Sequence, residues 1–246
     1  MPDPLDEHCP VAFKDAIISL VQKASGTPYK TYKDIPYTAI VDPMEDNLRN
    51  SLLMFIGKFS DKCASDMLSG KSTPQKELVS DFSLIKCEAR FDKNVLRIAR
   101  ELIWVAYNSE KDTSLSYEYL HNMFNEVYDA IVEAEDALYN VPDRHIKTSE
   151  IEELENNLQT AIENFQVQMP SVFDPFAGGG AIPMEAARLG CRSFGNDINP
   201  VAHIIERCSA EFPQTYGKPI YYSEQEFNNR YGVDGVKFAH SKAMLS

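Results

Sequence analysis

The stretch that decides the fold is SVFDPFAGGGAIPMEAARLG, residues 171–190. It opens with a short apolar run, Ser171–Phe173, which predicts a strand. Three consecutive glycines follow at 178–180, and apolar residues then recur at helical spacing over 183–189. Gly190 is a natural helix stop. A strand, a glycine-rich turn and a helix in this order are typical of α/β proteins that bind nucleotides.

A second strand and helix follow this unit directly. Residues 192–195 predict a strand, and Asp197-Ile198-Asn199-Pro200 leads into a helical pattern over 201–208. Two strand–loop–helix units in succession predict the opening of a doubly wound α/β sheet. Asp197 lies 19 residues after Gly178. A carboxylate near this spacing, at the end of the second strand, is placed to accept both hydroxyls of a ribose, and Ile198 is placed to pack on an adenine ring.

The residues around the glycines indicate which nucleoside ligand fits the turn. Glycine has no Cβ, so a ligand can approach the backbone, and the following helix points its free N–H groups toward that ligand. Asp174 adds negative charge to the lip of the turn, and Pro175-Phe176 adds an aromatic side chain. This lip suits the zwitterionic, cationic S-adenosylmethionine better than a pyrophosphate. It also disfavours an oxidoreductase that uses NAD.

Two strings carry a resemblance to a known family. DPFAGGGAIPMEAARLGC (174–191) and FGNDINPVAH (194–203) resemble the cofactor-binding segment of adenine-specific DNA methylases. The narrower likeness is to a large bacterial and archaeal group whose N-terminal part is a domain of unknown function. The similarity covers about residues 171–213, and 231–236 match more weakly. The resemblance implies a class I methyltransferase fold, S-adenosylmethionine as cofactor and adenine N6 of DNA as acceptor.

The resemblance also assigns residues. It implies that Asp174, Phe176, Ala177, Gly178 and Gly180 surround the methionine part of S-adenosylmethionine and that Asp197 binds its ribose. Together with their neighbours in the two loops they make up the predicted cofactor site, which is Asp174, Pro175, Phe176, Ala177, Gly178, Gly179, Gly180, Asp197 and Ile198.

The sequence departs from the family in two ways. Amino-methylases carry Asp/Asn/Ser-Pro-Pro-Tyr/Phe, which holds the exocyclic amine and stacks on the flipped base. No Pro-Pro dipeptide occurs here, and the nearest string is Asp34-Ile35-Pro36-Tyr37, so no catalytic residue is predicted. Moreover, 76 residues follow Pro170 (246 − 170), whereas a class I sheet has seven strands. The chain therefore resembles an N-terminal portion, a split subunit or a degenerate remnant.

The preceding two-thirds of the chain predict helices. The fold class expected is α/β: a mostly helical N-terminal region over 1–168, then the incomplete first half of a Rossmann-like methyltransferase sheet over 169–246. Asp92 is a predicted N-cap, Trp104 a predicted core residue, and Ser149 with Glu152 a predicted capping box. The expected apolar helical stripes fall within 13–21, 48–67, 95–103, 120–138 and 151–165, and the later segments 219–222 and 236–245 suggest a strand and a helix.

Charge and composition limit the partners. The chain has 24 basic and 37 acidic residues, a net charge of −13, and residues 125–166 alone hold 11 acidic and 2 basic residues. Such a chain repels phosphate backbones, so DNA is expected to be reached only through a partner. The five scattered cysteines form no C-x-x-C pair, and no metal site is expected. No apolar stretch suits a membrane span or a secretory signal, so a cytoplasmic location is expected.

Two functional hypotheses remain open. In the first, the chain is the S-adenosylmethionine-binding portion of a DNA adenine-N6 methyltransferase, and a second polypeptide supplies the rest of the domain. In the second, it is a non-catalytic interaction or regulatory subunit of a DNA-modification or defence system, with a vestigial methyltransferase half-domain. An open sheet edge, which a partner could complete, is expected in both.

Overall fold

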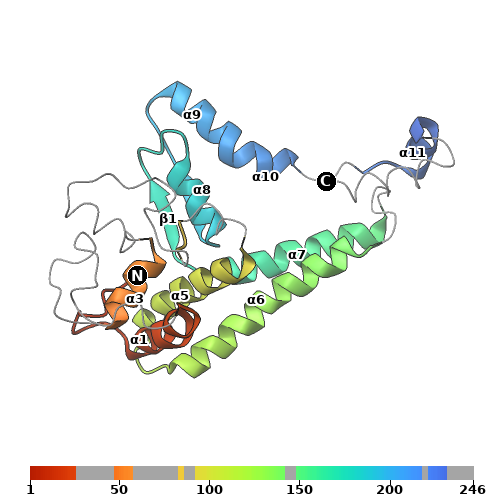
Figure 1. Ribbon diagram of the computed structural model, residues 1–246. Helices are drawn as coiled ribbons and strands as arrows, with labels where there is room; N and C mark the ends of the chain where they lie inside the picture. The colour runs from red at the N-terminus through yellow and green to blue at the C-terminus, as the bar shows by residue number, and fades with distance from the viewer. Residues whose placement is uncertain (26–46, 58–82, 86–91, 142–147, 218–220, 232–246) are drawn as a thin grey trace. The chain divides into compact units, whose positions relative to one another are not determined.

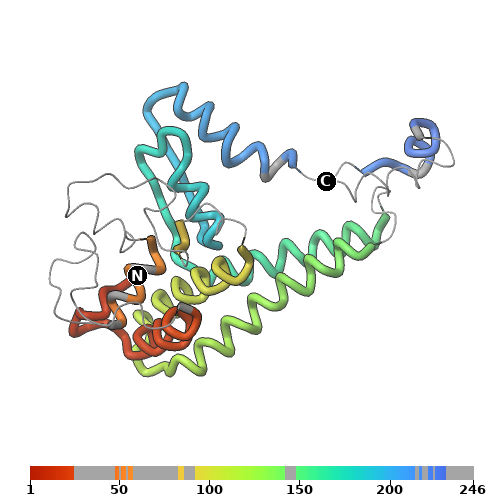
Figure 2. The backbone as a smooth tube through the Cα atoms, viewed as in Figure 1, coloured from red at the N-terminus to blue at the C-terminus, as the bar shows by residue number. Residues whose placement is uncertain are grey.

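The computed structural model describes residues 1–25, 47–57, 83–85, 92–141, 148–217 and 221–231 (Figures 1 and 2). These residues are mostly helical and contain one small parallel sheet. The chain divides into two compact units, Met1–Phe124 and Asn125–Ser246. The division falls inside one long helix, α6 (Tyr117–Tyr139).

The first unit is built from helices around an apolar core. α1 (Val11–Ala16), the π-helical η1 (Ile17–Gln22) and α2 (Lys23–Ser25) follow one another directly, and α3 (Asn47–Phe55), α5 (Lys93–Lys111) and the start of α6 complete the described part. Phe13, Ile17 and Val21 are buried, which confirms the predicted stripe at helical spacing. Trp104 is fully buried and meets the ring of Phe124 edge-on, with centroids 6.1 Å apart. Its prediction as a core residue is confirmed.

The ends of α5 show where local chemistry decides a helix boundary. Asp92 is the N-cap, and its carboxylate accepts from the backbone N–H groups of Asn94 and Val95, as predicted. The helix runs on past the predicted apolar stripe over 95–103 and ends at Lys111. Asn108 does not end it because its side-chain amide donates to the carbonyl of Trp104, one turn earlier, within the helix.

The second unit begins with a pair of long helices. The later part of α6 and α7 (Ser149–Gln166) contact through Tyr128 and Phe165, whose ring centroids are 5.9 Å apart. The N-cap of α7 is Thr148, whose hydroxyl accepts from the N–H of Ile151. The capping box predicted at Ser149 is therefore wrong by one residue, because the Thr148 hydroxyl occupies the cap and Ser149 is already helical.

The sheet follows α7. β1 (Ser171–Asp174) and β2 (Arg192–Gly195) are parallel, with Phe173 opposite Phe194, and both strands lie where the sequence predicts them. α8 (Ala181–Arg188) connects them and contacts both. The chain continues through α9 (Pro200–Glu206), the π-helical η5 (Arg207–Glu211), α10 (Phe212–Tyr216) and α11 (Glu224–Tyr231).

Several predicted features lie outside the described residues. They are the Asp34–Tyr37 string, most of the second half of the helical stripe over 48–67, and the helix expected over 236–245. The predicted division at 168/169 separates helical from α/β sequence and stays a prediction. Among the described helices, none combines the length and apolarity that a bilayer crossing requires.

Candidate functional site

The glycine turn joins β1 to α8. Gly178 and Gly180 have φ values of +54° and +79°, in the left-handed region that favours glycine. A Cβ built on Gly178 would meet no atom within 4 Å, so this backbone faces open space. Gly180 is the N-cap of α8 and offers no side-chain acceptor to the first turn of the helix. The turn therefore presents backbone N–H groups that an anionic or polar ligand group can use.

Asp197 holds the turn from the end of β2. Its Oδ2 accepts from the N–H of Gly178 at 2.9 Å, and its Oδ1 accepts from the N–H of Asn199 at 2.8 Å. These two bonds, first from Asn199 and then from Gly178, lower the pKa of the Asp197 carboxyl below its ordinary value. The spacing read from the sequence thus corresponds to a direct contact between the two loops. Each carboxylate oxygen keeps a second lone pair for a further donor.

The predicted lip residues lie on the same loops. The Asp174 Oδ1 accepts from the N–H of Phe176 at 3.0 Å and shapes the first bend after β1. The N–H of Asn196 donates to the Asp174 carbonyl, and the N–H of Ala177 donates to the Asn196 carbonyl, so the strand pairing continues into both loops. Phe176 and Ile198 are strongly exposed, as are Pro175 and Gly179, while Ala177 is buried. The two loops are therefore joined, and the side chains of Phe176 and Ile198 on them face solvent.

A separate cleft lies beside β2 rather than at the glycine turn. Its volume is about 500 Å³, and its walls come from β2, α8 and the α9–η5 segment. Burial raises the pKa of the Cys191 thiol, one of its lining groups. Another lining residue, Glu206, is a buried glutamate near the end of α9. The cleft could not be predicted from the sequence, because its walls come from elements whose contacts no local pattern encodes.

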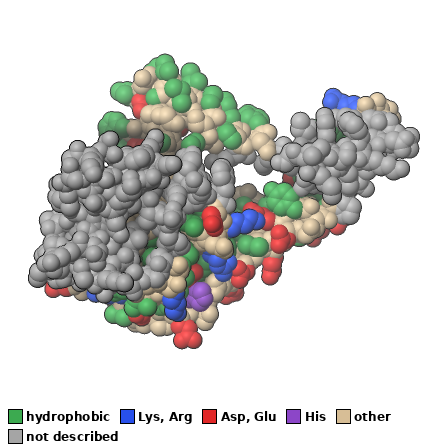
Figure 3. Space-filling view, viewed as in Figure 1, with side chains coloured by type: hydrophobic (Ala, Val, Ile, Leu, Met, Phe, Trp, Pro, Cys, Tyr) green, Lys and Arg blue, Asp and Glu red, His purple; other side chains and the backbone are tan. Residues whose placement is uncertain are grey.

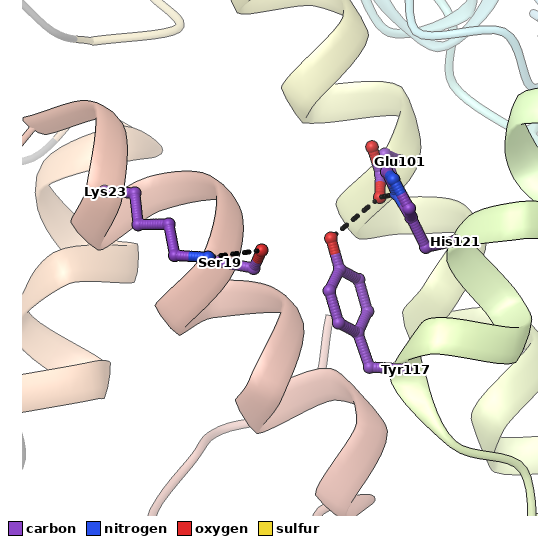
Figure 4. Close-up of polar contacts among 5 residues, drawn as sticks. All are labelled: Ser19, Lys23, Glu101, Tyr117 and His121. Carbon is purple, nitrogen blue, oxygen red and sulfur yellow. Dashed lines mark hydrogen bonds and ion pairs between the residues drawn. The ribbon is translucent and has the colours of Figure 1, made fainter.

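The first unit holds a second buried glutamate, also missed. The Oε1 atom of Glu101, on α5, accepts a hydrogen bond from the Tyr117 hydroxyl at 3.0 Å (Figure 4). His121 Nδ1 lies 2.6 Å from the same oxygen. Nearby, Lys23 Nζ donates to Ser19 Oγ at 3.4 Å. Burial, aided by the charge of Glu101, raises the pKa of the Tyr117 hydroxyl well above its usual range, so it stays a donor. The cluster joins α5 to α6 through a satisfied carboxylate.

The contact of His121 with Glu101 was not predicted. Tyr117 and His121 are four residues apart on one helix face, which was the available signal. His203, by contrast, is exposed on α9. Within the described residues, no group of three or more His, Cys, Asp and Glu side chains could hold a metal ion.

Comparisons with known proteins add no family to this geometry. No protein-family model, no curated protein and no solved structure matches the chain significantly.

Proposed function

We propose that the chain is the S-adenosylmethionine-binding portion of a DNA adenine-N6 methyltransferase with a Rossmann-like class I fold. The observation that carries the proposal is the bond between Asp197 and Gly178, which joins the end of β2 to the glycine turn. A nucleoside bound across these loops would set its ribose hydroxyls on Asp197 and its methionine part along the turn. The resemblance of the two loop sequences to adenine-specific DNA methylases supports the same ligand.

The sheet supports the further proposal that a second polypeptide completes the domain. Phe173 and Phe194 are opposite each other across the strands and are 64% and 56% exposed. Parallel sheets are normally covered on both faces. Here α8 contacts the strands, while the aromatic pair remains open to solvent. Figure 3 shows further apolar side chains gathered over the α8–α9 part of the chain. A partner carrying the remaining strands and the Pro-Pro-Tyr motif would cover this surface.

DNA would then be held by the partner. Acidic side chains line the exposed surface of α6 and α7 (Figure 3), and this charge opposes binding of a phosphate backbone. In this arrangement the chain supplies the cofactor site, and the partner supplies the basic surface and the base-flipping pocket.

Calorimetric titration with S-adenosylmethionine and S-adenosylhomocysteine tests the cofactor site. We expect micromolar binding by the chain, or by its complex with the partner, and Asp197→Ala should weaken it about tenfold or more, about 1.4 kcal/mol. Asp136→Ala, which removes an exposed carboxylate from α6, is the matched control and should bind normally. Unchanged affinity in Asp197→Ala, or no binding in either form, would reject the site.

The second candidate function is a non-catalytic interaction subunit. The observation that favours it is the exposed aromatic pair on the sheet, which needs a partner whether or not a cofactor binds. Recovery of a native complex without a Pro-Pro-Tyr chain and without S-adenosylmethionine binding would favour this alternative.

A further inference from the structure

Glu206 is a buried glutamate at the end of α9. It is 8% exposed and forms no hydrogen bond or ion pair with any residue that the structure describes. The neighbouring Arg207 does not neutralise it, because Arg207 makes two bonds, of 2.7 and 2.9 Å, to Glu211. A buried carboxylate is expensive unless a cation or hydrogen-bond donors satisfy it. Neither carboxylate oxygen of Glu206 is fully enclosed, so the carboxylate opens to the cleft and is available to a cation there.

Two glycines make the space for this side chain. A Cβ on Gly180 would lie 3.3 Å from Glu206 Cγ, and a Cβ on Gly195 would overlap Glu206 Oε1. The stem of Glu206 thus packs under the glycine turn, and its carboxylate lies against the end of β2. The two glycines leave room for this side chain, and its carboxylate lies at the wall of the cleft.

The rest of the cleft suits a ligand with an apolar stem and polar head. Pro183, Ala187 and Cys191 contribute apolar walls. Asn196 exchanges backbone bonds with the β1 side, and residues of a strand alternate in the edge to which they bond. Ser193 and Gly195 therefore direct their N–H and carbonyl groups to the free side of β2. The cleft combines the Glu206 carboxylate, an apolar wall and a row of backbone donors and acceptors, and it is also lined by Arg192, His203, Arg207 and Glu211.

We propose that this cleft binds an organic cation, an ammonium or guanidinium group on a short apolar stem, with Glu206 as its counter-ion. The cation comes either from a free amine or from a Lys or Arg side chain of an extended polypeptide lying along β2. The inference goes beyond the proposed function, because neither Glu206 nor the cleft belongs to the predicted cofactor site.

NMR titration of the ¹⁵N-labelled full chain tests the proposal, with n-butylguanidinium as probe and neutral n-butylurea as its isostere. We expect shifts of the Ser193, Gly195 and Glu206 amides with the cation only. Glu206→Gln should weaken the cation by at least about tenfold. Glu153→Gln removes the same charge from an exposed position of α7, outside the cleft, and should retain binding. Equal affinity for both probes, or for wild type and Glu206→Gln, would overturn the proposal.

Two further measurements identify the source of the cation and distinguish this proposal from the proposed cofactor site. Tighter binding of acetyl-Val-Arg-Val-amide than of n-butylguanidinium would assign the cation to a polypeptide, and equal binding would assign it to a free amine. Saturation with S-adenosylmethionine should leave the probe bound, and a chain that binds no S-adenosylmethionine should still bind the probe. The thermal midpoint of Glu206→Gln should not fall, because a fall would reveal a partner of Glu206 in the free chain and contradict the proposal.

Discussion

Glu101 and Glu206 are both buried glutamates on helices, but their surroundings differ. Glu101 is 1% exposed and is met by Tyr117 and His121, from the next helix. Glu206 is 8% exposed and has no such donor among the described residues. The Glu101 carboxylate is therefore hydrogen-bonded within a helical core, whereas the Glu206 carboxylate is open to a ligand. Glu101 thus needs no ligand, whereas Glu206 can pair with a cation that binds in the cleft.

Replacing each glutamate by leucine tests the difference between the two carboxylates directly. Glu101→Leu should destabilise the first unit by about 3 kcal/mol, because Tyr117 and His121 lose a charged acceptor. Glu206→Leu should leave stability unchanged or raise it, because no bond is lost. Urea unfolding checks both, with circular dichroism for the whole chain and the fluorescence of Trp104, the one tryptophan, for the first unit.

An exposed glutamate on α5 provides the control for the two leucine variants. Glu110→Ala removes an exposed carboxylate from the same helix as Glu101 and should change stability by no more than about 0.5 kcal/mol. If both leucine variants destabilised the chain equally, Glu206 would have a partner and the contrast between the two regions would be wrong.

A smaller effect tests how firmly α7 is packed against the α/β part. Gly190 has φ +86°, and a Cβ there would lie 2.7 Å from Phe165 Cε1. Gly190→Ala should therefore cost about 2 kcal/mol, from the left-handed backbone and the contact together. Thermal unfolding followed by circular dichroism measures it.

The control is Gly178→Ala, at a second left-handed glycine whose Cβ would meet open space. It should cost only about 1 kcal/mol, the backbone part alone. Equal losses of stability at the two glycines would show that the contact with Phe165 adds nothing to the cost of the left-handed backbone.

The N-cap of α7 should give the next smaller change. Thr148→Ala removes the acceptor for the Ile151 N–H and should cost about 1 kcal/mol. Thr160→Ala, in the middle of the same helix and exposed, should be neutral or slightly stabilising because alanine favours helix. Chemical unfolding of both variants distinguishes a cap from a general effect of losing threonine. A loss at Thr160 as large as at Thr148 would contradict the assignment of the cap.

The smallest expected change is in pH dependence at the glycine turn. Because the folded pKa of Asp197 is lowered, its contribution to stability is present above the unfolded value of about 3.9 and is lost as pH falls through the lower folded pKa. The Gly178 amide shift in NMR should therefore titrate with a midpoint below about 3.9. In Asp197→Asn that titration should disappear. A midpoint at or above the ordinary value would mean that the bond does not hold in solution.

The features predicted from the sequence are those that local chemistry controls. β1, β2, the glycine turn and the Asp92 cap follow from short patterns of apolar spacing, glycine and capping residues, and they lie where expected. The contact between Asp197 and Gly178 could have been predicted, because parallel strands end at the same edge of a sheet.

The burial of the two glutamates could not be predicted from the sequence, for a physical reason. The partners of Glu101 lie 16 and 20 residues away on another helix, and the space for Glu206 depends on two glycines, one at the start of α8 and one at the end of β2. Such contacts exist only after the elements pack. The sequence shows glutamates in helical patterns, where an exposed position is the usual expectation.

The position of Glu206 against Gly195 has an evolutionary consequence. Because a side chain at position 195 would occupy the place of the carboxylate, the two positions are expected to change together in related chains. A relative with a larger residue at 195 should carry a shorter side chain at 206, and it should also have lost the anion that the cleft presents. Covariation between these two columns of an alignment would then separate relatives that keep the cleft from those that have filled it.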